Sequence, residues 1–171
     1  MKLDYLYEVL LFAVLILLQV LVFNQISIFG LATPFLYIYF LLKLPVGRNV
    51  FYVIIMGFLM GFIIDIFLNT PGINAAASTI IATLRQPLLR LFFTKDESED
   101  HIPSIYATPA PFIKFAIAMI VIHQTALYSL ESLSLFNPQI LLLRWAASIA
   151  LTLVLLFALD GFMFKTFTAN E

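Results

Sequence analysis

The sequence predicts an all-α integral membrane protein with about six transmembrane helices in a compact bundle. Hydrophobic residues make up 63% of the 171-residue chain, charged residues make up 11%, and the mean hydropathy is +1.04. Soluble domains carry about 25% charged residues, so a chain this apolar needs a lipid environment. At about 20 residues for each crossing, the length suits about six crossings in a single polytopic membrane domain covering residues 1–171.

Apolar stretches separated by turn-forming residues give the individual elements. We expect helices over residues 9–28, 31–44, 50–68, 73–93, 112–133 and 140–164, with turns such as Pro71-Gly72 and Asn137-Pro138 between them. The second stretch is short, because its apolar part, 35–44, covers only ~15 Å as a helix. It spans a membrane only if residues 31–34 contribute. A loop over 94–111 holds the acidic DESED run and a proline-rich segment.

The basic residues predict the orientation. The connections 24–34, 69–74 and 134–139 contain no lysine or arginine. The other side carries Lys2, Lys43, Arg48, Arg90, Lys95, Lys114 and Lys165. Because basic loops stay in the cytoplasm, we expect both termini and the 94–111 loop on the cytoplasmic side of the membrane. Asp4 and Glu8 do not suit the basic start of a cleavable signal, so the first stretch is expected to stay as a helix.

The composition disfavours several classes of function. There is no cysteine, and the net charge of −1 gives no basic excess for nucleic acid. The chain has two histidines, His101 and His123, which are too few for a typical zinc ligand set. No nucleophile motif, phosphate-binding glycine loop or paired acids with a histidine occurs, so we expect no enzyme and no cofactor.

A stripe of small and polar residues marks the third stretch. Gly57, Gly61, Asp65 and Asn69 recur every fourth residue and therefore share one face of a helix. Glycines on such a face let another backbone approach closely in a membrane. The small residues that follow are Gly72, Ala75, Ser78, Thr79 and Ala82. We interpret the whole set as a helix-packing or partner interface, whose neighbour is either the fourth stretch or a partner's helix.

Ionisable residues inside the apolar stretches are the second group of candidates. Asp65, Glu131 and Arg144 lie at similar depth, which predicts an ion pair of Arg144 with Asp65 or Glu131. The alternatives for Asp65 are a proton or solute site and a partner-facing surface. Near the opposite membrane face, Arg85 is expected to extend to the lipid headgroups or to pair with Asp160.

Two polar stripes are expected to face one another near the end of the chain. Gln124, Tyr128 and Glu131 share a face of the fifth stretch, and Arg144, Ser148 and Thr152 share a face of the sixth. Contact between the stripes would satisfy polar atoms inside the membrane. The acidic run 96–100 is expected to be a solvated loop, with contact to a basic cytoplasmic partner as the alternative.

The region GFLMGFIIDIFLNTPGINAAASTIIATL, residues 57–84, resembles the signature region of the bacterial rod shape-determining protein MreD family. That family has glycines in its third helix, an acidic residue after them, a glycine-bearing turn and a helix rich in Ala, Ser and Thr. The length, the hydrophobicity and the near-absence of soluble loops also match. The 94–111 loop is longer than the family pattern.

The resemblance implies a non-enzymatic scaffold subunit of the cell-elongation (rod) complex, required for cell shape and organised peptidoglycan synthesis. It implies binding to an MreC-like membrane protein and indirect association with an MreB-like filament, RodA and penicillin-binding protein 2. It also implies a fold similar to the S components of energy-coupling-factor transporters. The alternative is therefore a substrate-binding subunit of a small-molecule (vitamin) transporter.

Overall fold

The computed structural model describes residues 2–25, 32–94, 102–132 and 138–168, and these residues form helices and no sheet. The elements are α1 (Lys2–Leu18), the π-helix η1 (Gln19–Phe23), α2 (Ile38–Lys43), α3 (Val50–Leu68), α4 (Ile73–Phe92), α5 (Pro109–Glu131) and α6 (Pro138–Thr168). The all-α class is confirmed.

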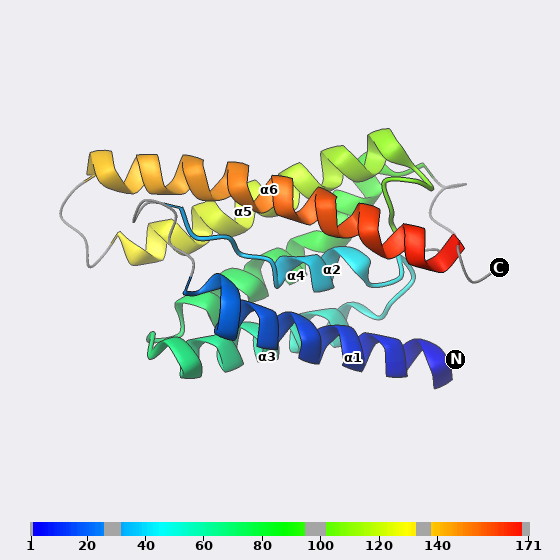
Figure 1. The fold of residues 1–171 in the computed structure, drawn as a ribbon, viewed down its shortest axis with the longest axis horizontal. Coiled ribbons are helices and arrows are strands. Elements are labelled where there is room, and N and C mark those ends of the chain that lie inside the picture. Colours follow the sequence, from blue (N-terminus) through cyan, green and yellow to red (C-terminus); the bar gives the residue numbers. More distant parts are fainter. Residues whose placement is uncertain (1, 26–31, 95–101, 133–137, 169–171) are drawn as a thin grey trace.

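The chain runs back and forth along the long axis of the molecule (Figure 1). In this view α1 and α3 lie along one side, α5 and α6 lie along the other, and α2 and α4 lie between them. Neighbours in sequence pack together, because α3 contacts α4, α4 contacts α5 and α5 contacts α6. The start of α1 and the end of α6 lie at the same end of the molecule.

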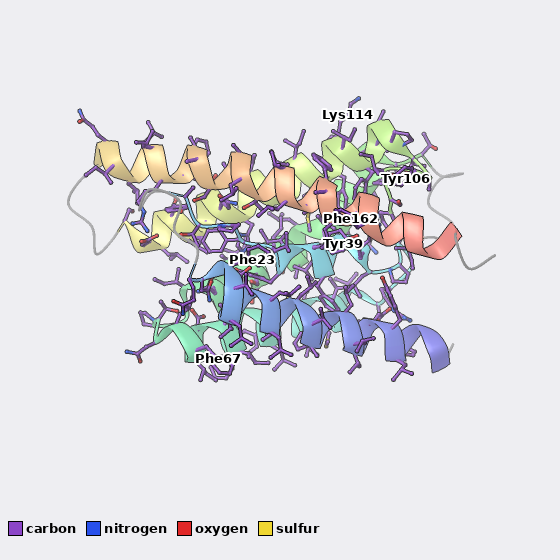
Figure 2. All side chains as sticks on the ribbon, in the orientation of Figure 1. Phe23, Tyr39, Phe67, Tyr106, Lys114 and Phe162 are labelled. Atoms are coloured by element: carbon purple, nitrogen blue, oxygen red, sulfur yellow. The ribbon has the colours of Figure 1, made fainter. Side chains whose placement is uncertain are left out.

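Among the described residues, four helical segments are long and apolar enough to cross a membrane. These segments are Tyr5–Phe23, Val50–Leu68, Pro109–Glu131 and Gln139–Phe162, so the chain is a multi-pass membrane protein. Their apolar side chains also cover the outside of the bundle, as Phe67 of α3 does in Figure 2, with 64% of its surface exposed. α4 is less apolar and is not one of these four segments, and it lies between α3 and α5.

The second predicted helix, 31–44, is wrong in its extent. Only Ile38–Lys43 is helical, and residues 33–35 before it have no regular secondary structure. Between Ala32 and Leu44 every residue except Thr33 is buried, and Figure 2 shows Tyr39 inside the bundle. This segment can be irregular because other helices supply partners for its backbone, which lipid cannot do. The segment 32–44 therefore forms the centre of the core.

The other helix boundaries are closer to the prediction. The 50–68 helix is confirmed as α3, and the 73–93 helix ends one residue early, at Phe92. The first helix begins at Lys2 rather than 9 and passes into η1, while 112–133 begins at Pro109 and 140–164 runs from Pro138 to Thr168. Pro109 can begin α5 because the first turn of a helix needs no backbone donor. Part of the predicted 94–111 loop, including DESED, lies outside the described residues.

The turn between α3 and α4 is set by residues that tolerate a left-handed backbone. Asn69 ends α3 with φ 54°, and Gly72 precedes α4 with φ 80°. Asparagine and glycine are the usual residues in this conformation. Two backbone bonds close the turn, from Thr70 N to the Asp65 carbonyl at 3.0 Å and from Gly72 N to the Thr70 carbonyl at 2.9 Å. This tight turn places the N-terminus of α4 beside the C-terminal end of α3.

Candidate functional site

The glycines of α3 lie against α4 of the same chain. A Cβ atom added at Gly61 would lie 2.4 Å from the Asn74 carbonyl oxygen, and one added at Gly57 would lie 2.8 Å from the Ala82 Cβ. Both distances are shorter than ordinary van der Waals contact. The neighbour that the sequence left open is therefore the fourth stretch, and the glycine face is not available to a partner.

The remaining small residues of the predicted interface follow the same contact. Ala75, Ser78 and Ala82 are buried, and the half-buried Thr79 donates its hydroxyl to the Ala75 carbonyl at 2.7 Å. Asn69 and Gly72 form the turn beyond it. The whole predicted set therefore belongs to the α3–α4 hairpin.

Asp65 is buried, with 3% of its surface exposed, and it binds the start of α4. Its Oδ1 accepts hydrogen bonds from the Asn74 backbone N at 3.1 Å, from Asn74 Nδ2 at 2.9 Å and from the Thr70 hydroxyl. Its Oδ2 accepts from the Ala75 backbone N at 2.8 Å. A carboxylate is favoured at a helix N-terminus because unpaired N–H groups point towards it.

The predicted pairing of Asp65 with Arg144 is wrong. The α4 N-terminus and the Thr70 hydroxyl already supply the donors that this carboxylate needs. Arg144 instead binds Glu131, with 3.1 Å between Nη1 and Oε1, which is the second of the two predicted pairings. The pair joins α5 and α6. The sequence missed this distinction because it shows depth along a helix but not which backbone groups are unpaired.

The polar stripes of α5 and α6 face one another, as predicted. Gln124 Nε2 donates to the Thr152 hydroxyl at 2.8 Å, and the hydroxyls of Tyr128 and Ser148 lie 2.8 Å apart. Together with the ion pair of Glu131 and Arg144, these contacts form a ladder along the two helices. We call these six residues the α5–α6 ladder.

Two members of the ladder also serve the buried segment 32–44. The Thr33 backbone N donates to the Ser148 hydroxyl at 3.0 Å, and the Phe35 backbone N donates to the Thr152 hydroxyl at 3.1 Å. From η1, Gln19 accepts from the Leu36 backbone N at 2.8 Å and donates to the Pro34 carbonyl at 2.9 Å. These side chains replace the hydrogen bonds that a continuous helix would have made.

Arg85 caps α2, so both predictions for it are wrong. Its side chain has no exposed surface and therefore does not reach lipid headgroups. Its Nε donates to the Leu41 carbonyl at 2.6 Å, and its Nη2 donates to the Leu44 carbonyl. The last carbonyls of a helix lack partners within that helix, and a cation there also suits the helix dipole. Because α2 is short and irregular chain precedes it, its last carbonyls require side-chain donors. The predicted helix over 31–44 gave no indication that Arg85 would supply them.

Asp160 joins α2, α6 and the chain before α5. Its salt-bridge partner is Lys43, and its carboxylate also accepts from the Tyr39 hydroxyl at 2.8 Å and from the Ile105 backbone N at 3.0 Å. Lys43 in turn donates to the Pro103 carbonyl at 2.8 Å. In the sequence analysis Lys43 contributes only to the predicted orientation in the membrane. The spacing of residues did not indicate that it would pair with Asp160.

A third ion pair, which the sequence did not predict, joins α1 to the start of α3. Glu8 is buried, with 3% of its surface exposed, and it pairs with Arg48. The Tyr52 hydroxyl donates to the other Glu8 oxygen at 2.8 Å, and the Arg48 guanidinium lies 4.1 Å from the centre of the Tyr5 ring. Glu8 lies directly before the apolar stretch that begins at residue 9, and its charge at that position was the available signal.

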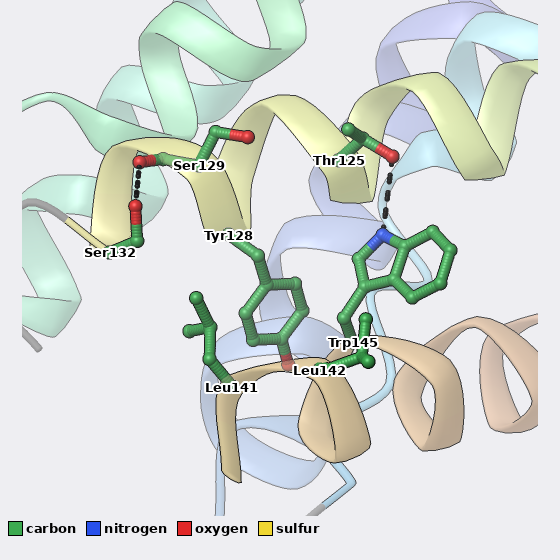
Figure 3. Close-up of a pocket in the computed structure, with 7 residues that line it drawn as sticks. All are labelled: Thr125, Tyr128, Ser129, Ser132, Leu141, Leu142 and Trp145. Atoms are coloured by element: carbon green, nitrogen blue, oxygen red, sulfur yellow. Dashed lines mark hydrogen bonds between the residues drawn. The ribbon is translucent and has the colours of Figure 1, made fainter. Parts of the chain in front are cut away.

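A shallow pocket of about 310 Å³ opens between α5 and α6 (Figure 3). Its lining residues are Thr125, Tyr128, Ser129, Ser132, Leu141, Leu142 and Trp145. The Thr125 hydroxyl donates to the Val121 carbonyl at 2.7 Å and accepts from Trp145 Nε1 at 3.2 Å, while Ser132 donates to the Ser129 carbonyl at 2.6 Å. These polar groups are turned to the protein, so the pocket offers an occupant a mainly apolar surface.

The described residues contain no group of three His, Cys, Asp or Glu that could hold a metal ion. Comparison of the chain with protein-family models, with curated proteins and with solved structures gives no match.

Proposed function

We propose that this chain is a non-enzymatic inner-membrane scaffold subunit of the bacterial cell-elongation complex. In this proposal it crosses the membrane six times in an S-component-like bundle, with both termini in the cytoplasm. It binds an MreC-like protein and, indirectly, an MreB-like filament, RodA and penicillin-binding protein 2. The resemblance of residues 57–84 to the MreD signature supplies these partners.

One structural observation supports a scaffold over the alternative of a vitamin-transporter subunit. The centre of the bundle is filled by the protein's own segment 32–44, in which every residue except Thr33 is buried. A solute-binding subunit needs a concave site with convergent polar groups. The hydroxyls and the amide near this centre are instead used by the protein's own backbone, as Ser148, Thr152 and Gln19 show.

The α3–α4 hairpin gives the family signature a physical role in this proposal. Gly57, Gly61 and Asp65 fix α3 on α4, so their task is to hold the shape of the subunit. Partner binding then falls to the outer faces of the spans. Those faces are apolar, with Phe51, Ile55 and Ile66 of α3 each more than half exposed.

Affinity purification from native membranes, followed by mass spectrometry, tests the proposed function. We expect an MreC-like protein and elongation synthases to co-purify, and we expect loss of the chain to make rod-shaped cells round or wide. Recovery of an energy-coupling ATPase with its transmembrane coupling subunit, and no MreC-like protein, would support the transporter alternative.

The proposed topology has its own test. The chain has no cysteine, so single cysteines at the exposed positions Asn69 and Ala107 can be labelled without background. We expect a membrane-impermeant maleimide to label the Asn69→Cys protein from outside spheroplasts and to label the Ala107→Cys protein only after lysis. Labelling of both proteins from outside would contradict the odd number of crossings that the proposed topology places between the two positions, and it would contradict the cytoplasmic placement of Ala107.

A further inference from the structure

Four buried side chains form a continuous hydrogen-bonded chain across the core. It begins at Asp65 of α3 and passes to Asn74 Nδ2 at 2.9 Å. From Asn74 Oδ1 it continues to the Tyr37 hydroxyl at 3.2 Å, and from there to His123 Nε2 of α5 at 2.8 Å. The four residues have between 0% and 3% of their surface exposed. We call them the Asp65–His123 chain. Its bond from Asp65 to Asn74 also holds α3 on α4, but neither that contact nor the proposed scaffold role requires the continuation to His123.

The donors around Asp65 fix the direction of the first bond. Its Oδ1 accepts from the Asn74 backbone N–H and the Thr70 hydroxyl, and its Oδ2 accepts from the Ala75 N–H. Such a set of donors favours an ionised carboxylate, which accepts hydrogen bonds and cannot donate them. Asn74 must therefore turn its amide NH₂ group to Asp65 and its Oδ1 to Tyr37.

The orientation of the Asn74 amide then fixes which atom donates in each of the next two hydrogen bonds, up to His123. Asn74 Oδ1 and the Tyr37 oxygen lie 3.2 Å apart, and between these two atoms only the Tyr37 hydroxyl carries a proton. Tyr37 therefore donates to Asn74. Its single proton is then used, so at 2.8 Å its oxygen must accept from His123 Nε2. A neutral histidine that donates through Nε2 has a bare lone pair on Nδ1.

His123 Nδ1 is buried and has no hydrogen-bond partner among the described residues. Buried polar side-chain atoms in folded proteins usually have a partner, so an unpartnered one needs an explanation. Its surroundings are mostly aromatic, with the Phe35 ring centre 6.1 Å and the Tyr37 ring centre 5.3 Å from the imidazole centre. Tyr128, whose ring centre lies 6.3 Å from that of Phe35, is bound to the Ser148 hydroxyl.

We propose that Asp65, acting through Asn74 and Tyr37, holds His123 as its Nε2–H tautomer and makes Nδ1 a binding site for one hydrogen-bond donor inside the bundle. Nδ1 then either accepts a hydrogen bond from a water molecule or takes up a transferable proton. Water would leave the imidazole neutral. A proton would give an imidazolium that still donates to Tyr37 through Nε2, with the Asp65 carboxylate as its counter-charge at the other end of the chain. Asp65 is a positioning residue in this proposal.

Nitrogen NMR of the full chain in lipid nanodiscs tests the tautomer directly. The chain has two histidines, so a His101→Gln protein labelled with ¹⁵N-histidine reports His123 alone. At neutral pH we expect a protonated Nε2 in this His101→Gln protein. A bare Nδ1 with magnetisation transfer from water supports the water arm, and a protonated Nδ1 that loses its proton on alkalinisation supports the proton arm.

Three results would overturn the proposal. The first is a neutral ring protonated at Nδ1, and the second is an even mixture of tautomers. The third is a bare Nδ1 that shows neither transfer from water nor protonation down to pH 5, because the site would then bind no donor.

Two variants test whether the Asp65–His123 chain of hydrogen bonds sets the tautomer of His123. Tyr37→Phe removes the acceptor for Nε2 and Asp65→Asn removes the charge that orients Asn74, so we expect either change to give a mixture of tautomers. Tyr39→Phe is the matched control, because Tyr39 lies in the same segment but binds Asp160. Circular dichroism identifies variants that do not fold, and Tyr37→Phe stands alone if Asp65→Asn fails. An unchanged Nε2–H tautomer in folded Tyr37→Phe would contradict the proposal.

Discussion

Two pairs of neighbouring helices in this molecule are held together in different ways. α3 and α4 approach so closely that a Cβ atom added at Gly61 would lie 2.4 Å from an α4 carbonyl oxygen. α5 and α6 are joined by the side chains of the α5–α6 ladder, including the bond from Gln124 to Thr152 and the ion pair of Glu131 and Arg144. Both solutions suit a membrane, where lipid removes the hydrophobic drive between helices.

The difference lies in which part of the chain bears the constraint. In the α3–α4 pair the backbones are close, so any added side-chain volume must displace backbone atoms. In the α5–α6 pair the contacts are at the ends of side chains, which can adjust. We therefore expect the first pair to tolerate substitution poorly and the second pair to lose stability in smaller steps.

Substitution of Gly61 gives the largest expected effect. Its added Cβ would meet the Asn74 carbonyl oxygen and carbon and the Ala75 Cα within 2.7 Å. Overpacking of a core costs about 1–3 kcal/mol and occasionally more, and contact with backbone leaves no rotamer to relieve it. We expect Gly61→Ala to lower the free energy of unfolding by at least about 3 kcal/mol and Gly61→Leu to prevent folding, as measured by thermal unfolding in detergent.

Gly57 provides the matched control within the same stripe. Its added Cβ would meet the Ala82 Cβ at 2.8 Å and the Ser78 carbonyl oxygen at 3.2 Å. We expect Gly57→Ala to be milder than Gly61→Ala, and we expect the double substitution Gly57→Ala and Ala82→Gly to recover part of the loss. A double variant no more stable than Gly57→Ala alone would show that the Ala82 contact does not set the approach of the helices.

Asp65→Asn comes next in expected size. The substitution removes the negative charge that accepts from the N–H groups of Asn74 and Ala75 at the α4 N-terminus. Hydrogen bonds to charged groups contribute about 1.5–3 kcal/mol each, and an amide retains part of this because it has one oxygen acceptor. We expect a loss of about 2–4 kcal/mol in unfolding free energy. A stable Asp65→Asn protein that loses uptake of a solute would favour a transport site instead.

The same two pairs show what could be predicted from the sequence. The spacing of four residues placed Gly57, Gly61 and Asp65 on one face, and a similar spacing placed the α5–α6 ladder, because regular helices preserve such patterns. The segment 32–44 is not a regular helix, so periodicity could not show that Arg85 caps α2 or that Lys43 meets Asp160. The Arg85 contacts depend on backbone carbonyls that become unpaired only where α2 ends, and the Lys43 contact depends on where the short α2 places that side chain.

Thr152 provides a test within the α5–α6 pair. Its hydroxyl accepts from Gln124 Nε2 at 2.8 Å and from the Phe35 backbone N at 3.1 Å. Thr152→Val therefore leaves the buried Phe35 N–H without an acceptor and leaves Gln124 Nε2 with only the Ser148 carbonyl, at 3.3 Å. Each unsatisfied buried group costs about 1–3 kcal/mol. Gln124→Leu removes one donor and leaves Thr152 bound to Phe35, so we expect about 0.6–1.7 kcal/mol for an interhelical bond in a membrane protein. Equal losses for the two variants would show that the bond to Phe35 contributes little.

The ion pair of Glu131 and Arg144 has the smallest expected effect. Both side chains are about one-quarter exposed, at 26% and 28%. Partly exposed pairs contribute about 0–1 kcal/mol because solvent screens the charges and both side chains lose conformational freedom. We therefore expect Glu131→Gln to lower the unfolding free energy by less than about 1 kcal/mol, and less in high salt, as measured in detergent by thermal unfolding. If Glu131→Gln lowered the unfolding free energy as much as Asp65→Asn does, the two helix pairs would not differ in their sensitivity to substitution, and the contrast between them would be contradicted.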